Sequence, residues 1–166
     1  IKTVIGRRAT DLFRELLDSE GRENLRTLVV NDDYSLQVLD RWNRPFLANI
    51  SAGQRQIRSI SFIAALAQAA SNDALLEMPL FMDTPFGRLS GEPRENLIRL
   101  MPGLTSQWIL LATDTEFRKQ EARLLREGGK WGRFYTLRML DDGNTKIEEQ
   151  NVDMVQAMLR DEGDTR

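Results

Sequence analysis

The feature of the sequence that most constrains the fold is a pair of short apolar runs that each end in polar residues. Leu80-Phe81-Met82 ends at Asp83, and the run at 108–112 ends at Thr113-Asp114. The segment between them has Pro93 near its start and apolar residues at helical spacing, so we expect a helix there. A strand–helix–strand pattern favours two parallel strands whose carboxyl ends share one edge of a sheet. The sequence therefore predicts an α/β fold, with ligand-binding residues at that edge.

The other segments are predicted from periodicity and turn residues. Ser90 is the expected N-cap of the helix that ends before Gly103. Asp142-Gly143 is the expected turn of a hairpin. Further helices are expected at 4–18, from Ser51 onwards, at 116–126 and at 152–159, and further strands at 28–30, 36–39, 134–140 and 145–149.

Residues 1–20 are rich in Arg and Glu, as expected for the foot of a longer helix or coiled coil. Residues 21–166 have the length of one domain. Because the sequence begins at Ile1 rather than at Met, we expect it to be a piece of a longer protein.

Composition excludes several classes of site. The 166 residues contain no cysteine and no histidine, so disulfides, thiolate metal sites and serine–histidine triads are excluded. The net charge of -2 gives no overall attraction to nucleic acid. No apolar run approaches the ~18 residues that span a bilayer, so we expect a cytoplasmic protein with no membrane partner.

The segment Ser51-Ala52-Gly53-Gln54, continued by Arg55-Gln56, stands where a helix is expected to begin. Free backbone N–H groups and the helix dipole make such a position suitable for a phosphate group, with a serine hydroxyl and a closely approaching glycine as additions. The alternative is purely structural, because serine is also a common N-cap.

Asp83 ends the first apolar run. A carboxylate at the end of a strand can hold Mg²⁺ through water and neutralise charge on a phosphate. The alternative is that Asp83 accepts hydrogen bonds from nearby backbone. Thr113-Asp114 also has a functional and a structural interpretation. These residues are either part of the ligand-binding edge of the sheet or simply a turn after a core strand.

Taken in order, these motifs resemble the C-terminal lobe of SMC-like coiled-coil ABC ATPases, over roughly residues 48–117. The resemblance implies that residues 51–56 form the signature motif, in which Ser51, Ala52, Gly53 and Gln54 bind the ATP of an opposing head. It implies Walker B at 80–85, with Asp83 holding Mg²⁺, a D-loop at 86–90 that includes Leu89 and Ser90, and a switch residue at Thr113. Ordered motifs are more specific than any one of them.

Two positions depart from the ABC pattern. The glutamate that usually follows the Walker B aspartate is replaced by Thr84, and the usual switch histidine is replaced by Thr113. Threonine cannot accept a proton at neutral pH. Two alternatives follow: nucleotide acts mainly as a clamp, or another carboxylate, Asp114 or Glu116, positions the attacking water. We count Asp83, Thr84 and Asp114 as candidate catalytic residues.

The amino-acid sequences of these motifs resemble those of the DndD family of DNA phosphorothioation systems. That resemblance implies an ATPase acting in DNA modification or repair, nucleoid-associated in the cytoplasm, with DNA and other DNA-modification subunits as partners. No Walker A sequence occurs in the chain. The resemblance therefore implies a separate N-terminal lobe that carries this loop, and a homodimer of heads that encloses ATP. The alternatives are a degenerate, non-catalytic nucleotide-sensing module and, less in keeping with the helical foot, a transporter subunit.

Positive charge gathers in and after the segment expected to be helical at 116–126. The basic residues are Arg118, Lys119, Arg123, Arg126, Lys130 and Arg133. They are candidates for contact with DNA phosphates, with a solvated helix face as the alternative. Arg7 and Arg8 are equally good candidates. The tryptophans Trp42, Trp108 and Trp131 are expected in the core.

Overall fold

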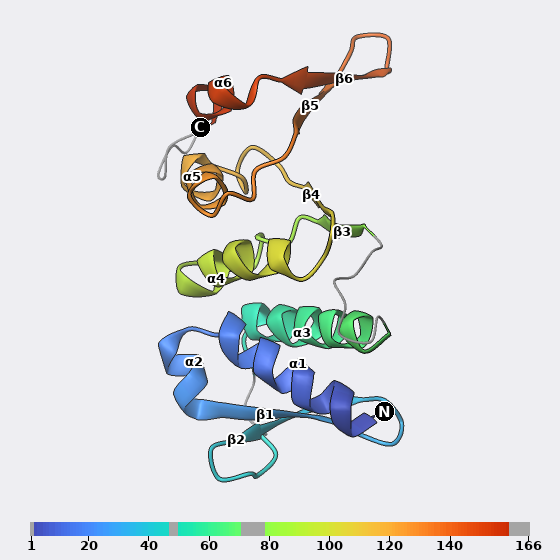
Figure 1. Ribbon diagram of the computed structural model, residues 1–166, viewed down its shortest axis with the longest axis vertical. Coiled ribbons are helices and arrows are strands. Elements are labelled where there is room, and N and C mark those ends of the chain that lie inside the picture. The colour runs from blue at the N-terminus through green and yellow to red at the C-terminus, as the bar shows by residue number, and fades with distance from the viewer. Residues whose placement is uncertain (1, 47–49, 71–78, 160–166) are drawn as a thin grey trace. The chain divides into compact units, whose positions relative to one another are not determined.

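A computed structural model describes residues 2–46, 50–70 and 79–159 (Figure 1). Ile1 lies outside the described residues, as do Ala48 at the start of the matched motifs and residues 160–166 at the end of the chain. The chain divides into two compact units, residues 1–111 and 112–166. Helices and strands occur in both, which confirms the α/β class.

The N-terminal part of the first unit consists of two helices, a hairpin and a long helix. These are α1 (Lys2–Leu16), α2 (Ser19–Asn24), β1 (Leu25–Val30), β2 (Leu36–Asp40) and α3 (Ala52–Ala70). Helix α1 lies along α3 and also contacts β1 (Figure 1). Its apolar residues recur on one face, and that face is buried: Ile5, Ala9, Leu12, Phe13 and Leu16.

A threonine fixes the hairpin to α1. The Oγ1 atom of Thr10 accepts a hydrogen bond from the Leu28 N–H, at 3.0 Å, and donates to the Leu28 carbonyl, at 3.2 Å. Helix α1 is therefore an integral layer of this unit. Its continuation into a coiled coil stays a prediction.

Helix α3 packs through a narrow face of small and branched residues. Ile57, Ser61, Ala64 and Ala65 are buried, and the Ser61 hydroxyl is satisfied by the Ile57 carbonyl, at 2.8 Å. Small side chains allow close approach of a neighbouring helix. Ile63 and Leu66 of the same helix are 56% and 47% exposed, so α3 is apolar beyond its buried face.

The strand–helix–strand pattern is confirmed. β3 (Leu80–Asp83) pairs in parallel with β4 (Trp108–Leu111), and α4 (Glu92–Leu100) with a short 3-10 turn, η1 (Met101–Gly103), connects them. The prediction of Ser90 as N-cap is wrong. The cap is Gly91, whose φ of 58° is accessible to glycine.

Only β3 and β4 are parallel among the described strands, because β1–β2 and β5–β6 are antiparallel pairs. The predicted mainly parallel sheet is thus represented by this one pair. Parallel strands are usually covered on both faces. Here Phe81 of β3 is 64% exposed and Leu111 of β4 is 46% exposed.

The second unit contains α5 (Lys119–Glu127), β5 (Phe134–Met139), β6 (Thr145–Gln150) and α6 (Val152–Met158). The hairpin turns at Asp142-Gly143 as predicted, with Gly143 at a φ of 82°. Phe117, Trp131 and Phe134 form an aromatic cluster with ring centroids 6.0 to 6.2 Å apart. Ion pairing between Arg126 and Asp153, at 3.2 Å, joins α5 to α6.

Candidate nucleotide-binding site

The signature segment occupies the start of α3. Ser51 is exposed, and its hydroxyl accepts a hydrogen bond from the Gln54 N–H at 3.1 Å, while the Gln54 side chain accepts one from the Ser51 N–H at 3.0 Å. This reciprocal pair is a capping box. Ser51 therefore caps α3, as the structural interpretation predicts. The start of the helix is still exposed, and its dipole can attract an anion.

Gly53 is required by the close approach of the segment that follows β3. A Cβ atom at this position would lie 2.7 Å from the Arg88 carbonyl oxygen and 3.5 Å from the Leu89 side chain. Any side chain would therefore push the two segments apart. The glycine brings the signature segment into contact with the predicted D-loop, residues 86–90.

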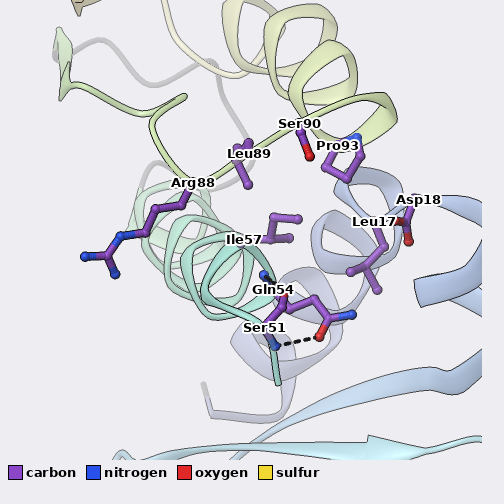
Figure 2. Close-up of a pocket in the computed structure, with 10 residues that line it drawn as sticks. Leu17, Asp18, Ser51, Gln54, Ile57, Arg88, Leu89, Ser90 and Pro93 are labelled. Carbon is purple, nitrogen blue, oxygen red and sulfur yellow. Dashed lines mark hydrogen bonds between the residues drawn. The ribbon is translucent and has the colours of Figure 1, made fainter. Parts of the chain in front are cut away.

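A pocket of about 120 Å³ lies where these two segments meet (Figure 2). Leu17 and Asp18 form the opposite wall, and the Arg88 side chain extends away from the cavity (Figure 2). Of the predicted site residues, Ser51, Gly53, Gln54, Leu89 and Ser90 line it. Leu89 is buried and anchors the loop, while Ser90 is exposed.

Asp83 and Thr84 lie at the carboxyl end of β3, and both are exposed. Thr84 has a φ of 45°, in the left-handed region that is unusual for a β-branched residue. Its N–H donates to the Leu111 carbonyl at the end of β4, at 2.8 Å. Such a conformation costs of order 1–3 kcal/mol and is concentrated at functional sites in proteins.

The chemistry of Asp83 fits a magnesium ion. Mg²⁺ prefers oxygen ligands, and it is commonly held by one or two carboxylates together with water and the phosphates of a nucleotide. No group of three acidic, histidine or cysteine side chains that could hold a metal by themselves exists within residues 2–46, 50–70 and 79–159. Asp83 alone supplies one carboxylate ligand, and the remaining ligands of such an ion would be water and phosphate oxygens.

Gln56 was not singled out as a site residue by the sequence. Its Nε2 donates to the Pro85 carbonyl at 2.7 Å, and so connects α3 to the turn that follows Asp83. Its place at the end of the signature-like segment 51–56 was the only sequence signal. The partner on the chain, 29 residues away, follows from the packing of α3 against this turn.

Thr113 and Asp114 belong to the second unit, where both are exposed. The Thr113 hydroxyl lies 2.9 Å from that of Thr115, and the Thr113 carbonyl accepts hydrogen bonds from the N–H groups of Glu116 and Phe117. These residues form a turn, so the predicted helix at 116–126 begins later, at Lys119. Arg118 is extended, and its N–H is bound by the Glu121 side chain at 2.8 Å.

Much of the basic charge after Thr113 is paired. Arg123 lies 3.6 Å from Glu127, Arg126 lies 3.2 Å from Asp153, and Arg133 lies 3.8 Å from Glu149. Pairing reduces the local field that would attract a phosphate backbone. A contact between DNA and the 118–133 patch stays a prediction.

Trp42 is not in the core, contrary to the sequence prediction. Its side chain is 60% exposed, with the Arg41 guanidinium 4.1 Å and the Arg44 guanidinium 4.8 Å from the ring centroid. The turn is organised by Asp40, whose Oδ1 accepts from the N–H groups of Trp42 and Arg44. Cation–π contacts of this kind stabilise an exposed aromatic ring.

The fold is that of SMC ATPase heads. One similar structure comes from a study of the ATP-driven dimerization and DNA-stimulated activation of SMC ATPases, with a TM-score of 0.61 and 14% identity, covering 94% of this chain and 89% of that one. A second is the Smc head domain with a coiled coil and joint from Pyrococcus yayanosii, with a TM-score of 0.62 and 15% identity.

A third is the Smc head domain of Pyrococcus furiosus with an extended coiled coil, bound to the C-terminal domain of ScpA, with a TM-score of 0.60 and 14% identity. The chain covers 28% of the second structure and 37% of the third. No protein-family model and no curated protein matches the sequence. In the described part of the chain, no helix has the length and apolar character needed to span a membrane.

Proposed function

We propose that this chain is the C-terminal lobe of an SMC-like ATPase head, and that it binds and hydrolyses ATP only as part of a complete head. The observation that carries the proposal is the contact between the start of α3 and the segment after β3. A Cβ atom at Gly53 would lie 2.7 Å from the Arg88 carbonyl oxygen, and Gln56 binds the Pro85 carbonyl. The signature-like and Walker B-like segments, separate in sequence, lie in one compact unit, and the chain as a whole is similar in fold to SMC heads.

In this proposal, the nucleotide is ATP with Mg²⁺. Asp83 holds the metal through water beside the nucleotide of its own head. Ser51, Ala52, Gly53 and Gln54 contact the nucleotide of the partner head, where the helix dipole of α3 favours the negative γ-phosphate. Leu89 and Ser90 form the D-loop, and Thr113 is the switch residue. Because Thr84 has no carboxylate, Asp114 or Glu116 is proposed to position the attacking water.

The missing N-terminal lobe, which would carry Walker A, is proposed to complete the sheet. Two parallel strands are too few for an independent sheet, and β3 and β4 pair only with each other among the described strands. The exposed side chains of Phe81 and Leu111 are suited to burial by further strands. In the second unit, Leu137 and Ile147 face each other across the β5–β6 pair and are each 65% exposed.

The finer proposal is a homodimer of heads that acts on DNA with other DNA-modification subunits, as the resemblance of the motifs to DndD implies. This homodimer would work in the cytoplasm, close to the nucleoid. One of the SMC structures to which the chain is similar comes from a study of ATP-driven dimerization and DNA-stimulated activation. A non-catalytic nucleotide-sensing head is the second candidate, and it is favoured by Thr84 at the position after Asp83 and by Thr113 at the switch position.

Turnover separates the two candidates. In a complete head, Asp83→Ala should abolish ATP hydrolysis while leaving the fold intact, because the Asp83 side chain is exposed. Hydrolysis can be followed by phosphate release at saturating MgATP, with the exposed Asp141→Ala as the matched control. Nucleotide binding without turnover in the parent head would establish the sensing module instead.

A further inference from the structure

The side chain of Gln56 joins the two halves of the candidate site. Its Nε2 lies 2.7 Å from the carbonyl oxygen of Pro85, which is a buried residue. Gln56 lies in the first turns of α3, which Ser51 caps, and Pro85 follows Asp83 in the same turn. A displacement of the start of α3 is therefore transmitted to the turn after β3 through one short hydrogen bond.

The turn that receives this bond is held in an unfavourable conformation. Thr84 has a φ of 45°. Such a residue persists only where its surroundings determine it. Two contacts do so: the Leu111 carbonyl binds the Thr84 N–H at 2.8 Å, and Gln56 binds the carbonyl of the next residue. The direction of the Asp83 carboxylate depends on the backbone that these contacts fix.

The chemistry of the Gln56 side chain indicates that its role is the hydrogen bond to the Pro85 carbonyl rather than the filling of space. Its amide oxygen is buried and accepts no hydrogen bond from the described part of the chain. A buried amide oxygen without a donor is unfavourable, and an apolar side chain of similar length would avoid this cost. The amide is thus explained by the bond that its nitrogen donates.

We infer that Gln56 is a positioning residue for the magnesium site: by holding Pro85, it fixes the left-handed turn that directs Asp83 toward the metal of the same head. The inference rests on the proposed function, since it concerns the same ATP site. Its distinctive consequence is that Gln56 serves the site to which its own head contributes Asp83, even though it lies at the end of the signature-like segment that serves the other site.

Mixed dimers of complete heads test this. Heads carrying Asp83→Asn, in large excess, pair with nearly every head that retains Asp83. Dimers of two Asp83→Asn heads are inactive, so turnover reports one site, made from Asp83 of the working head and Ser51 of the inactive head. Gln56→Met is introduced into one head at a time, and phosphate release is measured against Mg²⁺ concentration.

In the working head, Gln56→Met should lower turnover by about 2- to 12-fold, the range expected for one lost hydrogen bond, and raise the Mg²⁺ concentration at half-maximal rate. In the inactive head, it should leave both quantities near their parent values. Gln56→Lys restores a donor and should recover most of the turnover, whereas Gln56→Glu places an acceptor against the carbonyl and should not. Gln37→Met, the same change on β2, is the control and should alter neither.

An effect that follows the inactive head would overturn the inference, because Gln56 would then act through the signature helix. Equal effects from both heads, or none, would overturn it as well. If Gln56→Met heads do not fold, the Lys and Glu pair decides by the same criterion. Absence of any MgATP-dependent dimer of parent heads would instead refute the proposed function, and the inference with it.

Discussion

Gly53→Ala is predicted to destabilise the protein, although alanine is normally the better helix former. Gly53 is the second residue of α3, where the intrinsic gain from Gly to Ala is at most about 1 kcal/mol. Against this, the added Cβ would lie 2.7 Å from the Arg88 carbonyl oxygen, so helix and loop must separate by about 0.7 Å to reach ordinary contact. Overpacking of this kind costs about 1–3 kcal/mol. We expect a net loss of about 1 kcal/mol.

Gly6→Ala supplies the matched control. Gly6 lies inside α1, and a Cβ there would meet its nearest atoms at 3.9 Å, an ordinary contact. This substitution should stabilise by about 0.5–1 kcal/mol. Urea-induced unfolding of each single variant, analysed with a common slope, gives the comparison. If Gly53→Ala stabilised the protein as much as Gly6→Ala, the close approach of the D-loop to the signature helix would be refuted.

Two further predictions concern turns. Thr84→Gly should raise the free energy of unfolding by about 1 kcal/mol, since relief of the positive φ exceeds the entropy cost of glycine; urea unfolding checks this, and a loss of stability would contradict it. The pKa of Asp40 should lie below its ordinary value, because the Arg44 N–H donates to its carboxylate. The contribution of Asp40 to stability is then present above that ordinary value and lost as the pH falls through the lowered pKa; a side-chain NMR titration with an unshifted midpoint would contradict this.

The sequence was informative where one local pattern had one structural solution. Apolar runs ending in Asp83 and in Thr113-Asp114 predicted the parallel pair, and the register of β3 with β4 confirms it. Asp142-Gly143 predicted the second hairpin because few sequences favour a tight turn as strongly. The position of Ser51 at a helix start was equally readable, since Ser and Gln three residues apart form a capping box.

The sequence-based predictions were wrong where a local turn, which hydrophobic periodicity does not reveal, determines the structure. Ser90 is a better N-cap than glycine by preference, yet the chain turns at Gly91 with a positive φ. The helix expected from Glu116 begins at Lys119 because the Thr113 carbonyl accepts hydrogen bonds from the N–H groups of Glu116 and Phe117 in a local turn. Trp42 was expected in the core, but two arginines cover its ring at the surface.

The candidate site was predictable in its residues and not in its connections. The left-handed Thr84, the 2.7 Å bond from Gln56 and the contact of Gly53 with Arg88 all depend on how α3 packs against the turn after β3. None of them has a signature within a short window of sequence. The pairing of Arg126 with Asp153 likewise depends on α5 meeting α6.

The most direct test of the central claim is MgATP binding by this chain, alone and joined to an N-terminal lobe that carries Walker A. Isothermal titration would measure binding, and sedimentation velocity would measure association of the heads. We predict no measurable binding by the chain alone, and binding with dimerisation once the lobe is present. Tight binding by the chain alone, or binding by the completed head without dimerisation, would contradict the assignment of this chain as one lobe of a split ATPase head.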